Sequence, residues 1–180
     1  MSDRAKTLRD LLARCTPADA TERAFVGRLG ALLGHGEAAF SRDHYDPGHV
    51  TASAFVLDPT GSRLLLIHHA KLGIWVQPGG HVDPEDVDVL AAARREVREE
   101  VGLAELELAR EGVFDVDIHP LPARATAPRH EHFDVRFVFR AATLDFAASD
   151  EVMGARWVAI DELAAVTDAS VQRAASKLRR

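Results

Sequence analysis

A nine-residue run from Arg95 to Leu103 constrains this 180-residue chain more than any other segment. Its acidic residues, Glu96, Glu99 and Glu100, stand at i, i+3 and i+4, so they would share one face of a helix. Like charges at this spacing destabilise an isolated helix by about 0.2–0.5 kcal/mol per pair. A bound divalent cation would neutralise the cluster, and its oxygen-only donors favour Mg²⁺ or Mn²⁺ over zinc.

Length and composition are those of an ordinary globular protein. A chain of 180 residues suffices for one domain with a core and some additional structure. The hydrophobic fraction is 47% and the charged fraction 28%, and no apolar run approaches the roughly 20 residues that a bilayer-spanning helix needs. We therefore expect no membrane partner.

Net charge and cysteine content limit the cell compartments and the classes of ligand that fit this chain. The formal net charge of −6 argues against a nucleic-acid partner, because phosphate-binding surfaces are usually basic. A small anionic ligand held through a metal fits better. Cys15 is the only cysteine, so it forms no internal disulfide, and we expect it buried or half-buried in a helix. The N-terminus has no signal-peptide pattern, which favours a cytoplasmic location.

The first 45 residues read as a helical extension. Leu8, Leu11 and Leu12 have helical spacing, and a second helix is expected from Thr16, where Thr-Pro-Ala-Asp supplies an N-cap and an early proline. Gly34 offers a stop for that helix. We favour a packing or dimer-contact role over a substrate lid, because nothing in the apolar stripe demands chemistry. The stripe could close over its own domain or over a second copy, so a homodimer stays open.

Beyond residue 45 the pattern predicts strands around one central helix. Alternation or short apolar runs predict strands at 50–57, 63–69, 74–77, 133–142 and 155–158, with a strand-rich stretch at 106–119. Helical patterns occupy 87–101, 160–166 and 170–178. This order predicts an α/β fold with a mixed sheet between helices.

The run Arg95–Leu103 resembles the second half of the Nudix box, Arg-Glu-aliphatic-x-Glu-Glu-x-Gly-aliphatic. The first half of that box, a glycine followed by five residues and a glutamate, is not matched. Counting from Gly80 places the box glutamate at Asp86, whereas counting back from Arg95 places it at Val87. The chain thus carries one extra residue, with Asp86 or Asp88 beside the missing glutamate. The departure concerns loop geometry more than chemistry.

The resemblance implies both fold and activity. It implies a Nudix-type α/β/α sandwich with a mixed sheet over about residues 48–168, in a hydrolase domain of residues 46–180 that follows the extension at 1–45. It also implies metal-dependent hydrolysis, with Mg²⁺ or Mn²⁺, of a nucleoside diphosphate linked to another moiety. Water attacks phosphorus, and the metal neutralises charge on the phosphate oxygens.

Site residues follow from the same resemblance. Glu99 and Glu100 resemble the principal metal ligands, and Glu96 resembles a further ligand or the group that orients water. Gly79 would offer its carbonyl to the metal, while Arg95 would hold the glutamates through ion pairs. Family members often add an acid from a later loop, for which the candidates are Glu131, Asp150 and, slightly preferred, Glu151.

Substrate-binding candidates lie in the box loop and in the strands around it. They are Gly80, His81, Lys71, His119, Glu131, His132 and Glu151. Strand alternation would point His130 and His132 to one face, and Asp115, Asp117 and His119 to one face, so the two sets could share a polar pocket. Such histidines could contact phosphate or base, form a second, nitrogen-rich metal site, or simply be solvated.

Two other functions are compatible with the same resemblance. A non-catalytic, nucleotide-sensing Nudix domain usually loses box glutamates, which this chain keeps. An isoprenoid diphosphate isomerase asks for a catalytic cysteine near the pocket, and Cys15 in a helical extension is a poor candidate. The specific substrate stays undetermined because selectivity lies outside the box.

Overall fold

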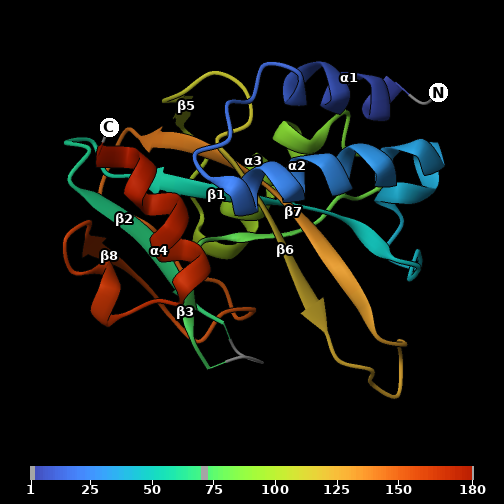
Figure 1. The fold of residues 1–180 in the computed structure, drawn as a ribbon. Coiled ribbons are helices and arrows are strands. Elements are labelled where there is room, and N and C mark those ends of the chain that lie inside the picture. Colours follow the sequence, from blue (N-terminus) through green and yellow to red (C-terminus); the bar gives the residue numbers. More distant parts are fainter. Residues whose placement is uncertain (1–2, 70–72, 180) are drawn as a thin grey trace. The chain divides into compact units, whose positions relative to one another are not determined.

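The structure, a computed structural model, describes residues 3–69 and 73–179. Its α-helices are α1 (Asp3–Leu12), α2 (Ala20–Leu32), α3 (Val89–Val101) and α4 (Ala169–Ala175), and its 3₁₀ helices are η1 (Leu33–Phe40), η2 (Leu163–Ala165) and η3 (Ser176–Arg179). The strands are β1 (Gly48–Leu57), β2 (Arg63–His68), β3 (Trp75–Val76), β4 (Gly79–His81), β5 (Leu106–Leu108), β6 (Asp115–Leu121), β7 (His130–Ala141) and β8 (Ala155–Ala159), as Figure 1 shows.

The chain divides into two compact units. The first unit comprises Met1–Ser53, Gly80–Ala92 and Glu111–Phe137, and the second comprises Ala54–Gly79, Ala93–Arg110 and Val138–Arg180. Strands β1 and β7 and helix α3 each begin in the first unit and end in the second. Each unit is built on its own strand pairings.

In the first unit, β4 and β7 pair with β1, and β6 pairs antiparallel with β7. The register of the last pair places His119 opposite His132 and Asp115 opposite Arg136. Helices α1 and α2 contact each other and η1, and α2 also contacts β6. Leu29 is fully buried, as expected for the apolar face of a packed helix.

In the second unit, β2 pairs antiparallel with β8, with β3 and with the end of β1. The end of β7 pairs with β5, with Arg140 opposite Glu107. The turn between β1 and β2 is held by the buried carboxylate of Asp58, which accepts hydrogen bonds from the N–H groups of Ser62 (2.8 Å) and Arg63 (3.1 Å). The strands predicted at 50–57 and 63–69 are therefore present and pair antiparallel across this turn.

Several predicted helix boundaries were wrong. Helix α2 begins at Ala20 instead of following Thr16, because the Asp19 carboxylate caps it by accepting the Glu22 N–H at 2.8 Å. Helix α1 ends at Leu12, so the half-buried Cys15 lies after the helix and not in it.

Further boundaries in the structure also differ from the predicted ones. Helix α3 begins at Val89, two residues later than predicted, and the stretch 160–166 contains only the 3₁₀ helix η2. The predicted loop at Gly79–Gly80 contains β4, and β7 begins at His130, earlier than the apolar pattern indicated. The stretch 106–119 holds two separate strands, β5 and the start of β6.

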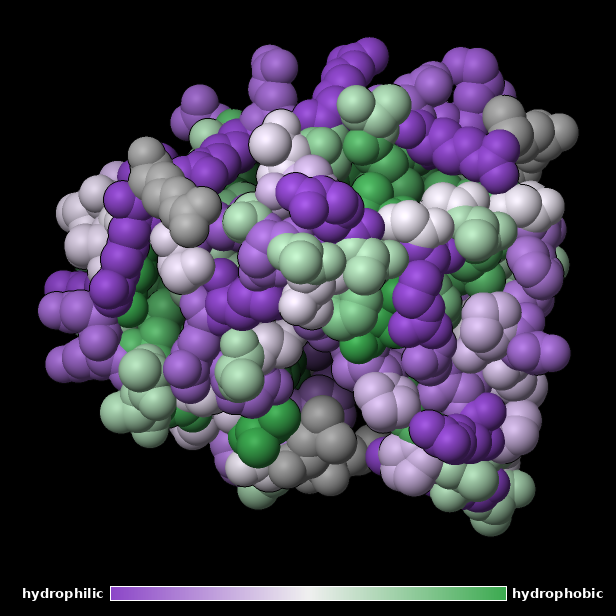
Figure 2. All heavy atoms as spheres, in the orientation of Figure 1, coloured by the Kyte–Doolittle hydropathy of each residue, from purple (hydrophilic) through white to green (hydrophobic). Residues whose placement is uncertain are grey.

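The surface in view is largely polar. Figure 2 shows hydrophilic side chains over much of the visible face, with hydrophobic side chains in smaller patches. None of the helices formed by residues 3–69 and 73–179 is long and apolar enough to cross a bilayer.

Candidate active site

Helix α3 carries the three carboxylates of the Arg95–Leu103 run in the second unit. Glu99 is exposed and Glu96 is half-buried, whereas Glu100 is only 9% exposed. Arg95 Nη1 donates to Glu96 Oε1 at 2.9 Å and to Glu99 Oε2 at 2.8 Å. The guanidinium therefore holds two of the three carboxylates in place, and it has the contacts that the resemblance implied for it.

Glu100 is the unusual member of this cluster. Its Oε2 accepts the N–H of Gly79 at 3.0 Å. Burial, with smaller contributions from the charges of Glu96, Glu151 and Glu99, raises the pKa of Glu100 to about 8, although the Gly79 hydrogen bond acts in the opposite sense. Gly79 thus contacts the cluster through its N–H, whereas the resemblance implied its carbonyl. At neutral pH the Glu100 carboxyl holds a proton unless a cation replaces it.

The C-terminal end of α3 is fixed by a glycine and by a later segment. Gly102 has φ +69, and its N–H donates to the carbonyl of Arg98 at 3.0 Å, as expected for a helix-ending glycine. Ser149 N–H donates to the carbonyl of Glu100 at 2.9 Å and Ala147 N–H to that of Val101 at 3.0 Å. These bonds satisfy carbonyls that a helix end leaves open. They also anchor the segment that leads to Glu151, whose charge acts on Glu100.

Two aspartates hold the segment between Gly80 and Arg95, which contains the extra residue. Asp86 accepts the N–H of Asp83 at 2.8 Å, and Asp88 accepts the N–H of Ala91 at 2.7 Å, at the start of the helix. Between them Val87 is 78% exposed. The two aspartates stabilise the loop and the helix start, while the side chain of Val87 points to solvent.

The carboxylate set fits a hard divalent cation. Its donors are oxygens, which Mg²⁺ and Mn²⁺ prefer. Burial is the main cause of the raised pKa of Glu100, and the neighbouring carboxylates Glu96, Glu151 and Glu99 raise it as well. A cation at Glu96, Glu99 and Glu100 would remove that repulsion.

A second polar region, in the first unit, lies on alternating positions of three paired strands. Thr51 Oγ1 and Ser53 Oγ on β1 donate to Asp134 Oδ1 on β7 at 3.2 and 2.6 Å. Arg136 donates to the carboxylates of Asp134, through Nε at 2.8 Å, and Asp115, through Nη1 at 3.3 Å. All of these side chains are buried. Burial alone would lower the pKa of Arg136, but Asp134, Asp117 and Asp115 raise it.

Histidines continue this polar face toward the other end of the strands. The ring of His132 lies 4.8 Å from that of His49, 5.3 Å from His81 and 5.4 Å from His119, between centroids. His130 stacks on His49 at 5.2 Å. The predicted juxtaposition of the β6 and β7 histidines is thus present. Sequence reasoning missed His49, although its alternation with Thr51 and Ser53 carried the signal.

Burial determines the charge state of these rings. Burial, together with the neighbouring histidines, lowers the pKa of His81 to about 4 and that of His132 to about 2. Burial also lowers the pKa of His49, although its hydrogen bond to the carbonyl of His44 acts in the opposite sense. At neutral pH these imidazoles are therefore neutral, and each keeps a nitrogen lone pair.

The remaining predicted site residues have different surroundings. Glu131 forms an ion pair with Arg28 of α2 in the first unit. Its carbonyl lies where a side chain at Gly48 would be, since a Cβ at residue 48 would stand 1.8 Å from Glu131 O. Gly80 and His81 form the end of β4. Lys71 lies outside the described residues.

An open cleft in the second unit involves none of the predicted site residues. It is lined by Pro59, Glu105, Leu106, Glu107, Arg140, Ala141 and Ala142. The chemistry-bearing groups on α3 are elsewhere in that unit, so the cleft carries no functional assignment.

The mixed α/β fold and the α3 carboxylates indicate an enzyme that hydrolyses phosphoric anhydrides. The family model of the NUDIX domain matches residues 47–178. The chain therefore belongs to the Nudix family, and the predicted fold class, a mixed α/β structure with helices at its N-terminus, is confirmed.

Solved structures share this fold at low sequence identity. A NUDIX-family hydrolase from Clostridium perfringens is 21% identical, with a TM-score of 0.55 over 73% of this chain and 96% of its own. The E. coli dihydroneopterin triphosphate pyrophosphohydrolase is 16% identical, with a TM-score of 0.53 over 71% of this chain and 92% of its own. The NUDIX domain of Shewanella oneidensis NrtR, complexed with ADP ribose, is 15% identical, with a TM-score of 0.53 over 72% and 85%. No curated protein matches the chain.

Proposed function

We propose that the chain is a divalent-metal-dependent pyrophosphohydrolase that cleaves a nucleoside diphosphate linked to another moiety by attack of water on phosphorus. The linked moiety would complete a nucleotide, a nucleotide-sugar or a dinucleotide. The observation that carries the proposal is the complete Arg95–Leu103 run at the C-terminal end of α3, in which the buried Glu100 accepts a hydrogen bond from Gly79. When bound, Mg²⁺ or Mn²⁺ would neutralise charge that develops on the phosphate oxygens.

The carboxylates have separable roles in this proposal. Glu99 and Glu100 hold the metal, and Glu96 is a further ligand or the group that orients water. Arg95 is a positioning residue, because its guanidinium contacts Glu96 and Glu99. Glu100 would have to lose its proton to bind the cation, because its raised pKa favours the protonated carboxyl.

Later segments supply the remaining groups. We assign the additional acid to Glu151, whose charge already acts on Glu100, in preference to Asp150. Gly80 and His119 are proposed substrate contacts. Two of the similar structures described above name dihydroneopterin triphosphate and ADP ribose, and both compounds join phosphates to a larger organic group. With one cysteine in its sequence, the chain needs no oxidising compartment, and we propose that it acts in the cytoplasm.

Hydrolysis of a substrate panel tests this proposal. Nucleoside diphosphate derivatives are incubated with Mg²⁺ or Mn²⁺ and the wild-type chain, Glu99→Gln or the control Glu162→Gln, and phosphate products are quantified. Glu162 is an exposed acid of the second unit outside the box, so its substitution should leave turnover unchanged. Metal-dependent turnover that collapses only in Glu99→Gln supports the enzyme. Binding of a panel member without turnover by all three proteins would instead identify a sensing domain.

A further inference from the structure

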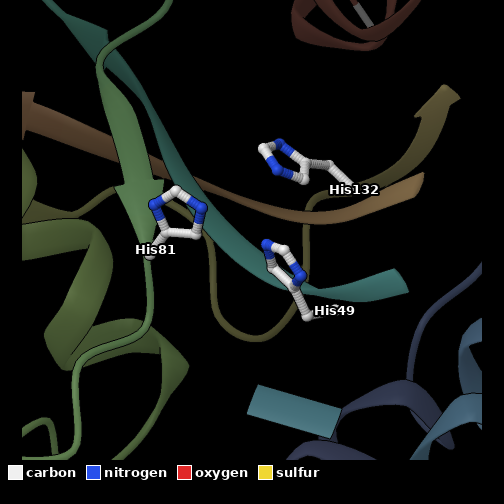
Figure 3. Close-up of side chains that lie close together, drawn as sticks. All are labelled: His49, His81 and His132. Carbon is white, nitrogen blue, oxygen red and sulfur yellow. The ribbon is translucent and has the colours of Figure 1, made fainter. Parts of the chain in front are cut away.

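Three histidine side chains of the first unit converge from three paired strands. His49 comes from β1, His81 from β4 and His132 from β7, and Figure 3 shows their rings turned toward one another. Each offers one ring nitrogen, and the three nitrogens lie within 4.8 Å of one another. None of the three belongs to the carboxylate set on α3.

We propose that His49, His81 and His132 form a three-imidazole site for Zn²⁺ or a similar divalent transition-metal ion. Imidazole nitrogen is a borderline ligand that suits zinc, copper, iron and nickel, whereas Mg²⁺ and Mn²⁺ prefer oxygen. The chain would thus hold two metal sites of different chemistry. This inference does not depend on hydrolysis at the box carboxylates.

The hydrogen bond at His49 selects the ring nitrogen that can bind a metal. His49 Nδ1 lies 3.1 Å from the carbonyl oxygen of His44. A carbonyl only accepts, so Nδ1 carries the hydrogen and Nε2 keeps its lone pair. Metal-binding histidines commonly donate their other ring N–H to a carbonyl in this way, which fixes the orientation of the ring.

Two of the candidate donors have no partner within the described part of the chain. His49 Nε2 and His132 Nε2 are buried and make no hydrogen bond to any of the residues at 3–69 and 73–179. A buried polar atom left in this state destabilises the fold, so such atoms call for an explanation. A metal ion that both nitrogens bind would remove this cost.

The three ring nitrogens need to approach one another only slightly to bind one zinc ion. Zinc bonds imidazole nitrogen at about 2.0–2.1 Å, which places tetrahedral ligand nitrogens about 3.3 Å apart. The nitrogens at up to 4.8 Å must therefore approach by at most about 1.5 Å, which side-chain rotation can supply. Three protein ligands leave a fourth coordination position open to water or to a ligand oxygen. The half-exposed side chain of His119 lies beside His132.

Direct contact of His81 and His132 with a substrate phosphate is the competing interpretation. It fits less well, because the lowered pKa of both rings leaves them neutral and so without charge to attract an anion. A neutral imidazole is instead the form that binds a metal.

Cobalt titration of the full chain is the primary experiment. The protein is stripped with a chelator and titrated with Co²⁺, whose visible absorption reports a tetrahedral site, and Zn²⁺ is then added as competitor. We expect one Co²⁺ per chain, displaced by Zn²⁺. His49→Gln and His132→Gln should each weaken binding by about 100-fold or more, since altering even the outer partners of a ligand costs about 10–100-fold.

Two variants serve as matched controls. His35→Gln removes an exposed histidine of the same unit that contacts His44 and lies outside the three-histidine set. Glu99→Gln removes a box carboxylate. Both should retain the cobalt spectrum, and equal loss in His35→Gln, or undiminished binding in His132→Gln, would overturn the proposal.

A measurement on the wild-type chain guards against variants that fail to fold. X-ray absorption of the zinc-loaded protein reads the donor atoms directly. Imidazole nitrogens at about 2.0–2.1 Å support the site. A shell of oxygen donors alone, or no retained zinc after dialysis, refutes it.

Discussion

The carboxylates of α3 and the histidines of the first unit are two polar clusters that respond to burial in opposite directions. Burial raises the pKa of Glu100 to about 8 and lowers that of His132 to about 2. The cause is the same, because desolvation disfavours the charged form of either group. Glu100 and His132 are therefore both driven toward neutrality at pH 7, but by opposite proton movements. An arriving cation would displace a proton from Glu100, whereas it would find the imidazoles already deprotonated.

The clusters also differ in how the chain assembles them. Glu96, Glu99 and Glu100 are neighbours because one helix has 3.6 residues per turn, so their proximity is local. His49, His81 and His132 are neighbours because three strands pair in one register, so their proximity depends on tertiary structure. Changes that weaken strand packing should consequently affect the histidines first.

The largest expected effect tests that dependence through Arg136. Arg136→Met leaves Asp115, Asp117 and Asp134 buried without the guanidinium that contacts all three. We expect the free energy of unfolding to fall by about 3–5 kcal/mol, as when one partner of a buried ion pair is removed. Urea unfolding followed by circular dichroism measures the change. The exposed Arg129→Met is the control, and an equal effect in both variants would contradict the assigned role.

The second-largest expected effect distinguishes the carboxylate cluster from the histidine cluster by the chemistry that each performs. Glu99→Gln should reduce hydrolysis by about 100-fold or more, since a bound metal contributes several kcal/mol to the transition state and 1.36 kcal/mol is tenfold. The same variant should leave cobalt absorption unchanged. Initial rates and Co²⁺ titrations on one preparation measure both quantities. Loss of both activity and cobalt binding in this variant would show that the two clusters act as one site.

The pH dependence of metal binding sharpens the contrast between them. Below about pH 8 the Glu100 carboxyl is protonated, so a cation that displaces this proton should bind about tenfold more weakly for each pH unit lowered. The pKa values of His81 and His132 lie at about 4 and about 2, and burial lowers that of His49, so Co²⁺ affinity at these neutral rings should stay nearly flat from pH 7 to 8. Electron paramagnetic resonance of free Mn²⁺ measures the pH dependence of binding at the carboxylates. Visible absorption of Co²⁺ measures the pH dependence of binding at the histidines. Parallel slopes at the two clusters would refute the comparison.

The smallest expected effect concerns the helix that carries the carboxylates. Gly102→Ala places a β-carbon at φ +69, in the left-handed region that L-residues disfavour by about 1–2 kcal/mol. The added Cβ would lie 3.4 Å from the carbonyl oxygen of Ala147, an ordinary contact, so backbone conformation alone sets the cost. Thermal unfolding should show a loss of about 1 kcal/mol. A neutral or stabilising outcome would mean that the helix end adapts.

Local features were predictable from sequence, and features of strand pairing were not. The spacing of Glu96, Glu99 and Glu100 and the terminal Gly102 identified α3, because periodicity and capping depend on neighbours along the chain. The true start of α2 was missed, because Asp19 competes with Thr16 as a capping residue and periodicity cannot rank them. His49 was missed as a member of the histidine cluster because its partners lie on other strands. Alternation gives the face of each strand but not which strand lies beside it.

Gly48 shows how a residue without any functional group can limit what the neighbouring residues tolerate. Its backbone approaches Glu131 so closely that even a methyl group would overlap the carbonyl oxygen. Any replacement must push β1 away from β7, and His49 and His132 lie next to that contact on the two strands. A saturation mutagenesis scan scored by retained metal would therefore mark position 48 as intolerant as any ligand, and a reader of such data alone would mistake a requirement for space for a requirement for chemistry.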